Sequence, residues 1–266
     1  MENGVEPKMN ILVTSGGTIE NIDAVRSISN ISSGRLGSLI AEKFSEESCV
    51  KKVFYICGRN SMQPQSDKLE VLYVSSVLTL EDAVKQVFLK ARIDIIIHCM
   101  AVSDYRVKAV TSAANLADLL LSNYTLFEKL GKQNAKDAIA TLIDKSESLI
   151  QGDGKISSNV DDMIILMERT SKIINQFQTL SPKSTLVGFK LLDNVSIEAL
   201  IDRGFQILTD NKCSFVLANN LKDINADQHI GYLIDRDKNY TRHETKAEIA
   251  AALVAATLKE RGSLKA

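Results

Sequence analysis

Six short apolar runs recur along the chain, and segments with helical periodicity separate several of them. The runs are almost continuous in apolar residues, which is typical of strands buried on both faces of a parallel sheet. This alternation predicts an α/β protein with a doubly wound, mostly parallel sheet and helices on both faces. The expected strands occupy 9–15, 52–58, 70–76, 94–100, 184–190 and 214–220, and the expected helices 34–47, 79–92, 196–208 and 246–260.

Two local patterns add detail to this outline. Thr79 and Asp82 form a capping-box pattern at the start of the helix expected over 79–92. Residues 231–244 have the pattern of a hairpin, with turn residues at 237–239 between two short strands.

Residues 107–168 break the alternation. The pattern over 112–150 is mostly helical, Gly152 and Gly154 mark a turn, and 163–167 alternates as a strand does. We therefore expect a single domain over 9–266 with an inserted flap or dimerisation region at about 107–168. Residues 1–8 are expected to be a disordered leader.

Composition excludes some classes of function. The chain carries 32 basic and 33 acidic residues and a net charge of −1, so no global field attracts nucleic acid or a lipid surface. No apolar run approaches 18 residues and no signal peptide is visible, which predicts a cytoplasmic protein without a membrane segment. The cysteines Cys49, Cys57, Cys99 and Cys213 form no CxxC pair, so we expect reduced, mostly buried thiols.

Polar segments follow four of the expected strands. Ligands of such Rossmann-like sheets bind beyond the carboxyl ends of the strands, so these segments predict a binding cleft. The opening loop is long and rich in Gly, Ser, Thr and Asn, but it contains neither GxxxxGK[ST] nor GxGxxG. The other segments are AVSDYR (101–106), GFKLLDN (188–194) and ANN (218–220), and the last contains Asn219.

The opening loop has the features of an anion site. Gly16 and Gly17 allow the backbone to bend and approach a ligand. Ser32, Ser33 and Gly34 precede a helix, whose N-terminal N–H groups bind anions. Ser33 could equally be only the N-cap of that helix. Arg26 and Arg35 add positive charge nearby.

The histidines indicate no metal site. His98, His229 and His243 are dispersed, without HxxxH spacing. We expect His98, inside an apolar strand, to be a hydrogen-bonded core residue, and Cys99 to contribute packing rather than act as a nucleophile.

The loop 14–37, TSGGTIENIDAVRSISNISSGRLG, resembles the signature of phosphopantothenoylcysteine synthetases, also called phosphopantothenate–cysteine ligases. The resemblance continues in the same order through AVSDYR (101–106), KISS (155–158), LVGFKL (186–191) and VLANN (216–220), and so covers nearly the whole chain. It implies a ligase that joins 4′-phosphopantothenate to L-cysteine in coenzyme A synthesis. It also implies a stand-alone form, without the flavin-dependent decarboxylase half and without flavin.

The resemblance implies CTP as co-substrate, an acyl-cytidylate intermediate, release of pyrophosphate and CMP, Mg²⁺ bound with the triphosphate, and a homodimer. Lys155 is the one lysine of KISS where the fused bacterial enzymes usually have several, so the choice between CTP and ATP stays open. A second interpretation is that the protein is a short-chain NAD(P)-dependent oxidoreductase. This interpretation lacks support because such an enzyme needs Tyr-x-x-x-Lys, and Tyr105 and Lys108 are three residues apart rather than four. A third interpretation is that the protein is a nucleotide-binding sensor.

The roles implied by the resemblance are specific. The amide of Asn30 donates to the developing oxyanion, Asp104 contacts the nucleotide at ribose or base, Phe189 packs on the nucleotide, and Lys155 reaches a phosphate. The plain structural alternatives are a turn residue for Asn30, a helix cap for Asp104, core packing for Phe189 and a solvated side chain for Lys155. The full set is Asn30 as the catalytic residue; Gly16, Gly17, Ser32, Ser33, Gly34, Asp104, Lys155 and Phe189 for the nucleotide; and Arg26, Arg35 and Asn219 for the substrate.

Overall fold

The computed structural model describes residues 8–144, 154–157, 160–225 and 228–263. These residues divide into two compact units. The first contains the described residues up to 18, 30–102 and those from 172 onward, and the second contains 19–29 and the described part of 103–171. Residues 1–7 of the expected leader, Gly152 of the expected turn and Ser158 of KISS lie outside the described residues. The assignment of one domain with an insertion stays a prediction.

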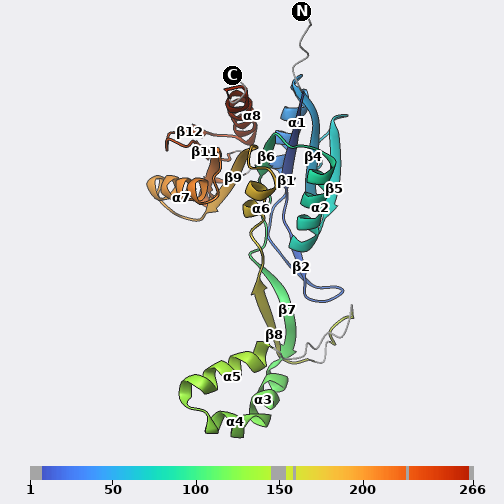
Figure 1. Ribbon diagram of the computed structural model, residues 1–266, viewed down its shortest axis with the longest axis vertical. Coiled ribbons are helices and arrows are strands. Elements are labelled where there is room, and N and C mark those ends of the chain that lie inside the picture. The colour runs from blue at the N-terminus through green and yellow to red at the C-terminus, as the bar shows by residue number, and fades with distance from the viewer. Residues whose placement is uncertain (1–7, 145–153, 158–159, 226–227, 264–266) are drawn as a thin grey trace, which may run out of the picture. The chain divides into compact units, whose positions relative to one another are not determined.

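The first unit is built on an eight-stranded sheet (Figure 1). Six neighbouring strands of the sheet pair in parallel. The last two strands at one edge pair antiparallel as a hairpin. This arrangement confirms the predicted mostly parallel, Rossmann-like α/β sheet. In spatial order the strands are β5 (Leu69–Val74), β4 (Val50–Gly58), β1 (Met9–Ser15), β6 (Ile95–His98), β9 (Thr185–Leu192), β10 (Phe215–Asn220), β11 (Gly231–Ile234) and β12 (Tyr240–His243).

Helices cover both faces of this sheet. Successive side chains of a strand point to opposite faces. Ile11 and Val13 of β1 accordingly pack with helices α1 (Arg35–Glu46) and α8 (Lys246–Ser263). Leu12, between them, packs on the other face with α2 (Val77–Lys90), α6 (Ile173–Leu180) and α7 (Ile197–Asp210). The near-continuous apolar runs follow from this burial on both sides.

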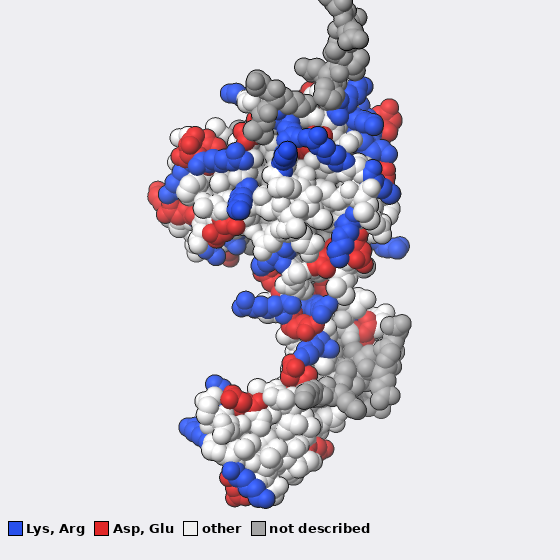
Figure 2. Space-filling model, viewed as in Figure 1, with Lys and Arg blue, Asp and Glu red and all other residues white. Residues whose placement is uncertain are grey.

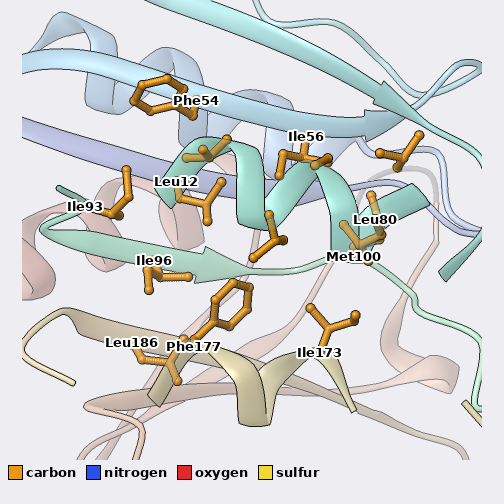
Figure 3. Close-up of a cluster of buried hydrophobic side chains, with 14 of the residues drawn as sticks. Leu12, Phe54, Ile56, Leu80, Ile93, Ile96, Met100, Ile173, Phe177 and Leu186 are labelled. Carbon is orange, nitrogen blue, oxygen red and sulfur yellow. The ribbon is translucent and has the colours of Figure 1, made fainter. Parts of the chain in front are cut away.

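The larger apolar cluster is formed by side chains from both halves of the sheet and the helices over it (Figure 3). Leu12, Ile56 and Ile96 of the strands contact this cluster together with Leu80 of α2 and Phe177 of α6. Full burial of each such side chain contributes about 1.5–3 kcal/mol. The cluster therefore fixes α6, a helix that the sequence analysis did not predict.

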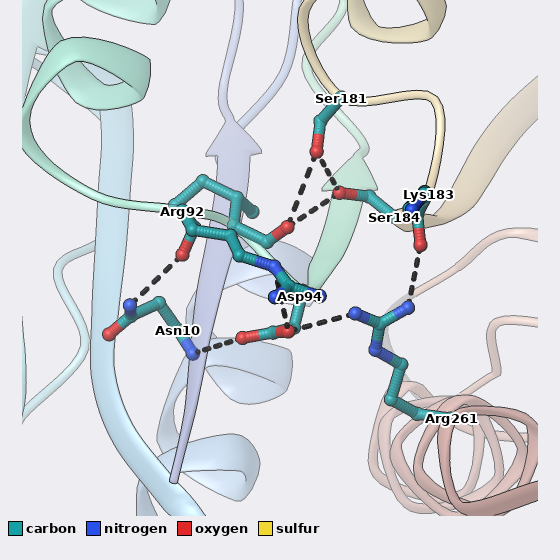
Figure 4. Close-up of polar contacts among 8 residues, drawn as sticks. Asn10, Arg92, Asp94, Ser181, Lys183, Ser184 and Arg261 are labelled. Atoms are coloured by element: carbon teal, nitrogen blue, oxygen red, sulfur yellow. Dashed lines mark hydrogen bonds and ion pairs between the residues drawn. The ribbon is translucent and has the colours of Figure 1, made fainter. Parts of the chain in front are cut away.

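A buried ion pair ties α8 to the amino ends of the strands (Figure 4). Arg261, 6% exposed, donates from Nη2 to Asp94 Oδ1 at 2.9 Å and from Nη1 to the carbonyl of Lys183 at 2.6 Å. Asp94 Oδ2 accepts from the backbone N–H of Asn10 at 3.1 Å. Asp94 directly precedes β6 and Asn10 lies at the start of β1, so the far end of α8 is fixed at this edge of the sheet.

The start of α2 differs from the prediction. The helix begins two residues earlier, with Ser76 as its N-cap, and the capping box joins Ser76 to Thr79. The side chain of Thr79 accepts from the N–H of Ser76 at 3.0 Å. The predicted box of Thr79 and Asp82 is therefore wrong, because Thr79 already lies inside the helix and cannot be its N-cap.

The second unit contains two antiparallel strand pairs and three helices. The opening loop, expected to be irregular, contains the first pair, and the inserted region contains the second, which has a register shift between Val107 and Ala109. None of the three helices has a buried residue. The elements are β2 (Ile19–Asn21), β3 (Ser27–Ser29), β7 (Tyr105–Ser112), β8 (Met163–Arg169), α3 (Ala113–Ser122), α4 (Tyr124–Lys129) and α5 (Lys132–Asp144).

Two further findings bear on the expectations from sequence. Among the described helices, none is both long and apolar enough to cross a membrane. His98 is partly buried and hydrogen-bonded, in agreement with the predicted hydrogen bond: its Nδ1 lies 2.8 Å from Thr14 Oγ1 of the neighbouring strand.

The ion pair at Asp94 generates a prediction about stability. Arg261→Met keeps most of the buried stem but leaves Asp94 with only the exposed Arg92, at 4.0 Å, as an ion-pair partner, so we expect a loss of about 3 kcal/mol in the free energy of unfolding. Urea denaturation measures this loss. The matched control is Arg242→Met, which breaks an exposed pair with Glu244 and should cost less than about 1 kcal/mol. Equal losses in the two variants would contradict the structural role of Arg261.

Burial of His98 generates a second prediction. Burial lowers the pKa of His98 to about 4, so the unfolded chain binds a proton near pH 6.5 that the folded chain does not. Stability should therefore fall as the pH drops through this window, and His98 should account for roughly 2–3 kcal/mol of the loss between pH 7 and 4.5. We expect His98→Gln to remove that part of the dependence in urea denaturation at each pH. An unchanged slope would show that His98 titrates normally.

Candidate functional site

A cavity of about 380 Å³ lies at the carboxyl ends of the parallel strands in the first unit. It is lined by 31–37 from the connection between β1 and α1, 99–101 after β6, Phe189 of β9 and Asn219 of β10. These segments meet where the strand order reverses on either side of β1, which is where open α/β sheets bind ligands. A larger cavity, about 640 Å³, lies beside β12 and α8 and mixes acidic with basic side chains. The smaller cavity is the candidate site because it lies at the carboxyl ends of the parallel strands.

The start of α1 packs closely against the end of β1. Gly34 is the N-cap, with φ +72°, and no side chain caps the helix. Ser15 Oγ donates to the carbonyl of Gly34 at 3.0 Å. A Cβ at Gly37 would lie 2.2 Å from Ser15 Oγ, so only glycine fits there. Ser33 is not the N-cap; its Oγ accepts from the N–H of Arg35 at 3.4 Å.

The structure brings six predicted residues together around the cavity. Asn219 is buried, whereas Ser32, Ser33 and Arg35 are exposed at its opening. The uncapped N-terminus of α1 offers backbone N–H groups and the positive end of the helix dipole, both of which favour an anion. The six are Ser32, Ser33, Gly34, Arg35, Phe189 and Asn219.

Three other predicted residues adjoin the lining residue Ala101 without lining the cavity themselves. Asn30 donates from Nδ2 to the carbonyl of Ala101 at 3.3 Å. Gly16 accepts the N–H of Ala101 at 2.8 Å. A Cβ at Gly17 would lie 2.3 Å from the carbonyl oxygen of Asn30. Gly16 and Gly17 thus allow the chain to hold Asn30 beside Ala101, and ligand contact by either glycine stays a prediction.

Arg26, Asp104 and Lys155 belong to the second unit. Asp23 organises two of them: it pairs with Arg26 at 3.5 Å and accepts the N–H of Ile156, next to Lys155, at 3.1 Å. The hydrogen bond from the N–H of Val25 is the largest cause that lowers the pKa of the Asp23 carboxyl. Asp104 is exposed, as is Lys155.

The sequence analysis missed His229 and Lys246, which also line the cavity. His229 Nε2 accepts from Asn219 Nδ2 at 2.8 Å, so Nδ1 carries the proton; in the described chain Nδ1 is buried without a partner. Burial, then the charge of Lys246, lowers the pKa of His229 to about 4. Neither residue follows a parallel strand. The sequence feature that could have pointed to Lys246 is its position on the first turn of a helix, where the helix dipole disfavours a cation.

The cavity has a positive, carboxylate-free lining. Arg35 and Lys246 are its charged residues, and neither forms an ion pair with another described residue. Burial raises the pKa of the Cys99 thiol to about 12, so the thiol is protonated at neutral pH. This lining suits an anionic ligand held by position and charge.

Metal and nucleic-acid sites have no comparable support. Within the described ranges, no three His, Cys, Asp or Glu side chains are grouped to hold a metal ion. Figure 2 shows basic and acidic side chains interspersed on the viewed face rather than gathered in a basic stripe.

Comparison with known proteins identifies the family. The family model described as the DNA/pantothenate metabolism flavoprotein C-terminal domain matches residues 7–142 and 145–260. The coenzyme A biosynthesis bifunctional protein CoaBC of Methanocaldococcus jannaschii is 26% identical over 249 residues, which are 92% of this chain and 49% of that protein. The chain therefore spans about half the length of the curated relatives it matches.

Solved structures agree with this match. The DNA/pantothenate metabolism flavoprotein of Streptococcus pneumoniae is 28% identical, with a TM-score of 0.75 over 95% of this chain and 99% of that one. A Cab2 mutant in complex with phosphopantothenate-cysteine shares the fold, with a TM-score of 0.67 over 98% of this chain and 90% of that one, at 14% identity. The predicted resemblance to phosphopantothenoylcysteine synthetases is confirmed. This chain belongs to the family of the DNA/pantothenate metabolism flavoprotein C-terminal domain.

Proposed function

We propose that this protein joins 4′-phosphopantothenate to L-cysteine in coenzyme A biosynthesis, with a nucleoside triphosphate as the activating co-substrate. The observation that carries the proposal is the positive, carboxylate-free cavity that the family's first motif forms with Phe189 and Asn219. A related fold, in the Cab2 mutant, has been solved with phosphopantothenate-cysteine, which is the product of this reaction.

The proposed chemistry needs activation because a carboxylate has no useful leaving group. The carboxylate of phosphopantothenate attacks the α-phosphorus of CTP, pyrophosphate leaves, and an acyl-cytidylate forms. The amine of cysteine then attacks the acyl carbon, CMP leaves, and the nitrogen releases its surplus proton to solvent as the amide forms. No electrons are transferred, so these steps require no flavin.

The protein's part is to position anions and to offset their repulsion. Ser32, Ser33 and the uncapped N-terminus of α1 would hold the triphosphate, and Phe189 would pack on the nucleotide. The amide of Asn30, anchored on Ala101, would donate to the oxyanion that develops at the substrate carbonyl. Asn219 would contact the substrate.

The remaining predicted roles belong to the same proposal. Asp104 would contact the ribose or base of the nucleotide, Lys155 a phosphate and Arg26 the substrate. Mg²⁺ would enter with the triphosphate and neutralise part of its charge, held mainly by phosphate oxygens and water. We also propose a cytoplasmic homodimer.

A product assay tests the proposed function directly. Purified protein is incubated with phosphopantothenate and either CTP or ATP, with and without cysteine. We expect phosphopantothenoylcysteine, pyrophosphate and the nucleoside monophosphate in equal amounts, and no full turnover without cysteine. Larger turnover with CTP than with ATP would assign the nucleotide. Nucleotide binding without any amide product would support a sensor instead, and a change in nicotinamide absorbance would support an oxidoreductase.

Asn30→Asp tests the proposed catalytic residue. A carboxylate repels the developing oxyanion and cannot donate a hydrogen bond, so we expect kcat to fall by roughly 100- to 1000-fold while nucleotide binding persists. Steady-state kinetics and calorimetric titration measure the two effects. The control is Asn115→Asp, which adds the same charge at an exposed position of α3 and should leave kcat unchanged. Near-normal turnover of Asn30→Asp would remove Asn30 from the mechanism.

A further inference from the structure

Lys246 occupies an unusual place for a cation. It is the first residue of α8 and partly buried, and it lines the cavity at the ends of the parallel strands. The dipole of α8 disfavours a positive charge at this end. Glu248, the acidic residue of the first turn, accepts the N–H of Glu244 at 2.8 Å. Lys246 thus lacks an ion-pair partner in the part of the chain that the structure describes.

Arg35 increases this unfavourable charge. Arg35 begins α1, Lys246 begins α8, and both side chains line the same cavity. Burial, and then the charge of Arg35, lowers the pKa of Lys246. The described lining residues include no carboxylate that could offset them. Two cations held together without a counter-charge destabilise a fold unless a ligand supplies the anion.

We propose that Lys246 and Arg35 together bind a phosphate group of a substrate in this cavity. Backbone N–H groups at the uncapped start of α1 add donors to the same group. The proposal rests on the proposed function and names a residue that the family signature in 14–37 does not contain. Both the triphosphate of the nucleotide and the phosphate of phosphopantothenate have the required chemistry, and the experiment distinguishes them.

The experiment compares three variants of the full chain. Lys246→Met removes the charge and keeps the stem, and Lys246→Arg restores a cation. Lys259→Met removes the same charge from an exposed position of the same helix. Inorganic triphosphate and 4′-phosphopantothenate are titrated separately by calorimetry, and thermal unfolding checks that each variant folds.

We expect Lys246→Met to weaken binding of one of the two probes roughly tenfold, with a shallower dependence of affinity on salt. Lys246→Arg should recover most of the affinity, and Lys259→Met should bind both probes as the unsubstituted chain does. Weaker binding of triphosphate would show that Lys246 and Arg35 bind the nucleotide. Weaker binding of phosphopantothenate would show that they bind the acid substrate.

Unchanged affinity of Lys246→Met for both probes would overturn the inference. So would an equal loss in Lys259→Met, because the effect would then be one of net charge. The product assay separates this failure from failure of the proposed function. Normal ligation together with no effect of Lys246→Met would reject only the proposed phosphate contact of Lys246 and Arg35. Triphosphate binding that depends on Lys246, without any ligation, would support this contact and reject the ligase.

Discussion

The close packing of α1 on the end of β1 is the constraint on which the site depends. Gly37 permits it, because any side chain there would collide with Ser15. The hydrogen bond from Ser15 to the carbonyl of Gly34 then fixes the start of the helix. With Gly34 at the N-cap, the helix has no N-cap side chain, although Ser33 Oγ accepts the N–H of Arg35 at 3.4 Å. The same backbone arrangement thus provides both a tight fold and a helix N-terminus that faces the cavity.

Helix α8 connects the two ends of the sheet. Its last turn is fixed by Arg261 to Asp94, at the amino ends of the strands. Its first residue, Lys246, reaches the cavity at their carboxyl ends. The helix has 18 residues and is therefore about 27 Å long, and Ile249 and Leu253 bury its inner side. A distant ion pair and apolar packing therefore hold Lys246 in place, without a polar partner beside it.

Sequence patterns predicted the parts of the fold that follow from burial on both faces. The parallel strands appear within one or two residues of their expected positions, because continuous apolar runs have few other interpretations. The short pair β2 and β3 was missed because it has little apolar periodicity, and α6 was missed because eight residues give a weak helical pattern. At α2, both Ser76 and Thr79 are residue types that cap helices, and Ser76 is the N-cap.

The same logic explains which site residues could be predicted. Phe189 and Asn219 lie in the carboxyl-terminal halves of parallel strands and the loop before α1 follows one, so topology alone places them at one edge. His229 precedes the antiparallel hairpin and Lys246 begins the helix after it, so no rule about strand ends applies to them. Their place depends on how the hairpin pairs beside β10 in the sheet, which periodicity does not encode.

Charge balance limits what the cavity can do by itself. In the proposed ligation, triphosphate, substrate phosphate and carboxylate carry about seven negative charges at neutral pH. The described lining contributes two cations, Arg35 and Lys246, because the lowered pKa of His229 leaves it neutral. Helix α1 adds a partial charge of roughly +0.5. In the proposed ligation, most of the remaining compensation would come from the Mg²⁺ that enters with the triphosphate and from cations outside the described lining.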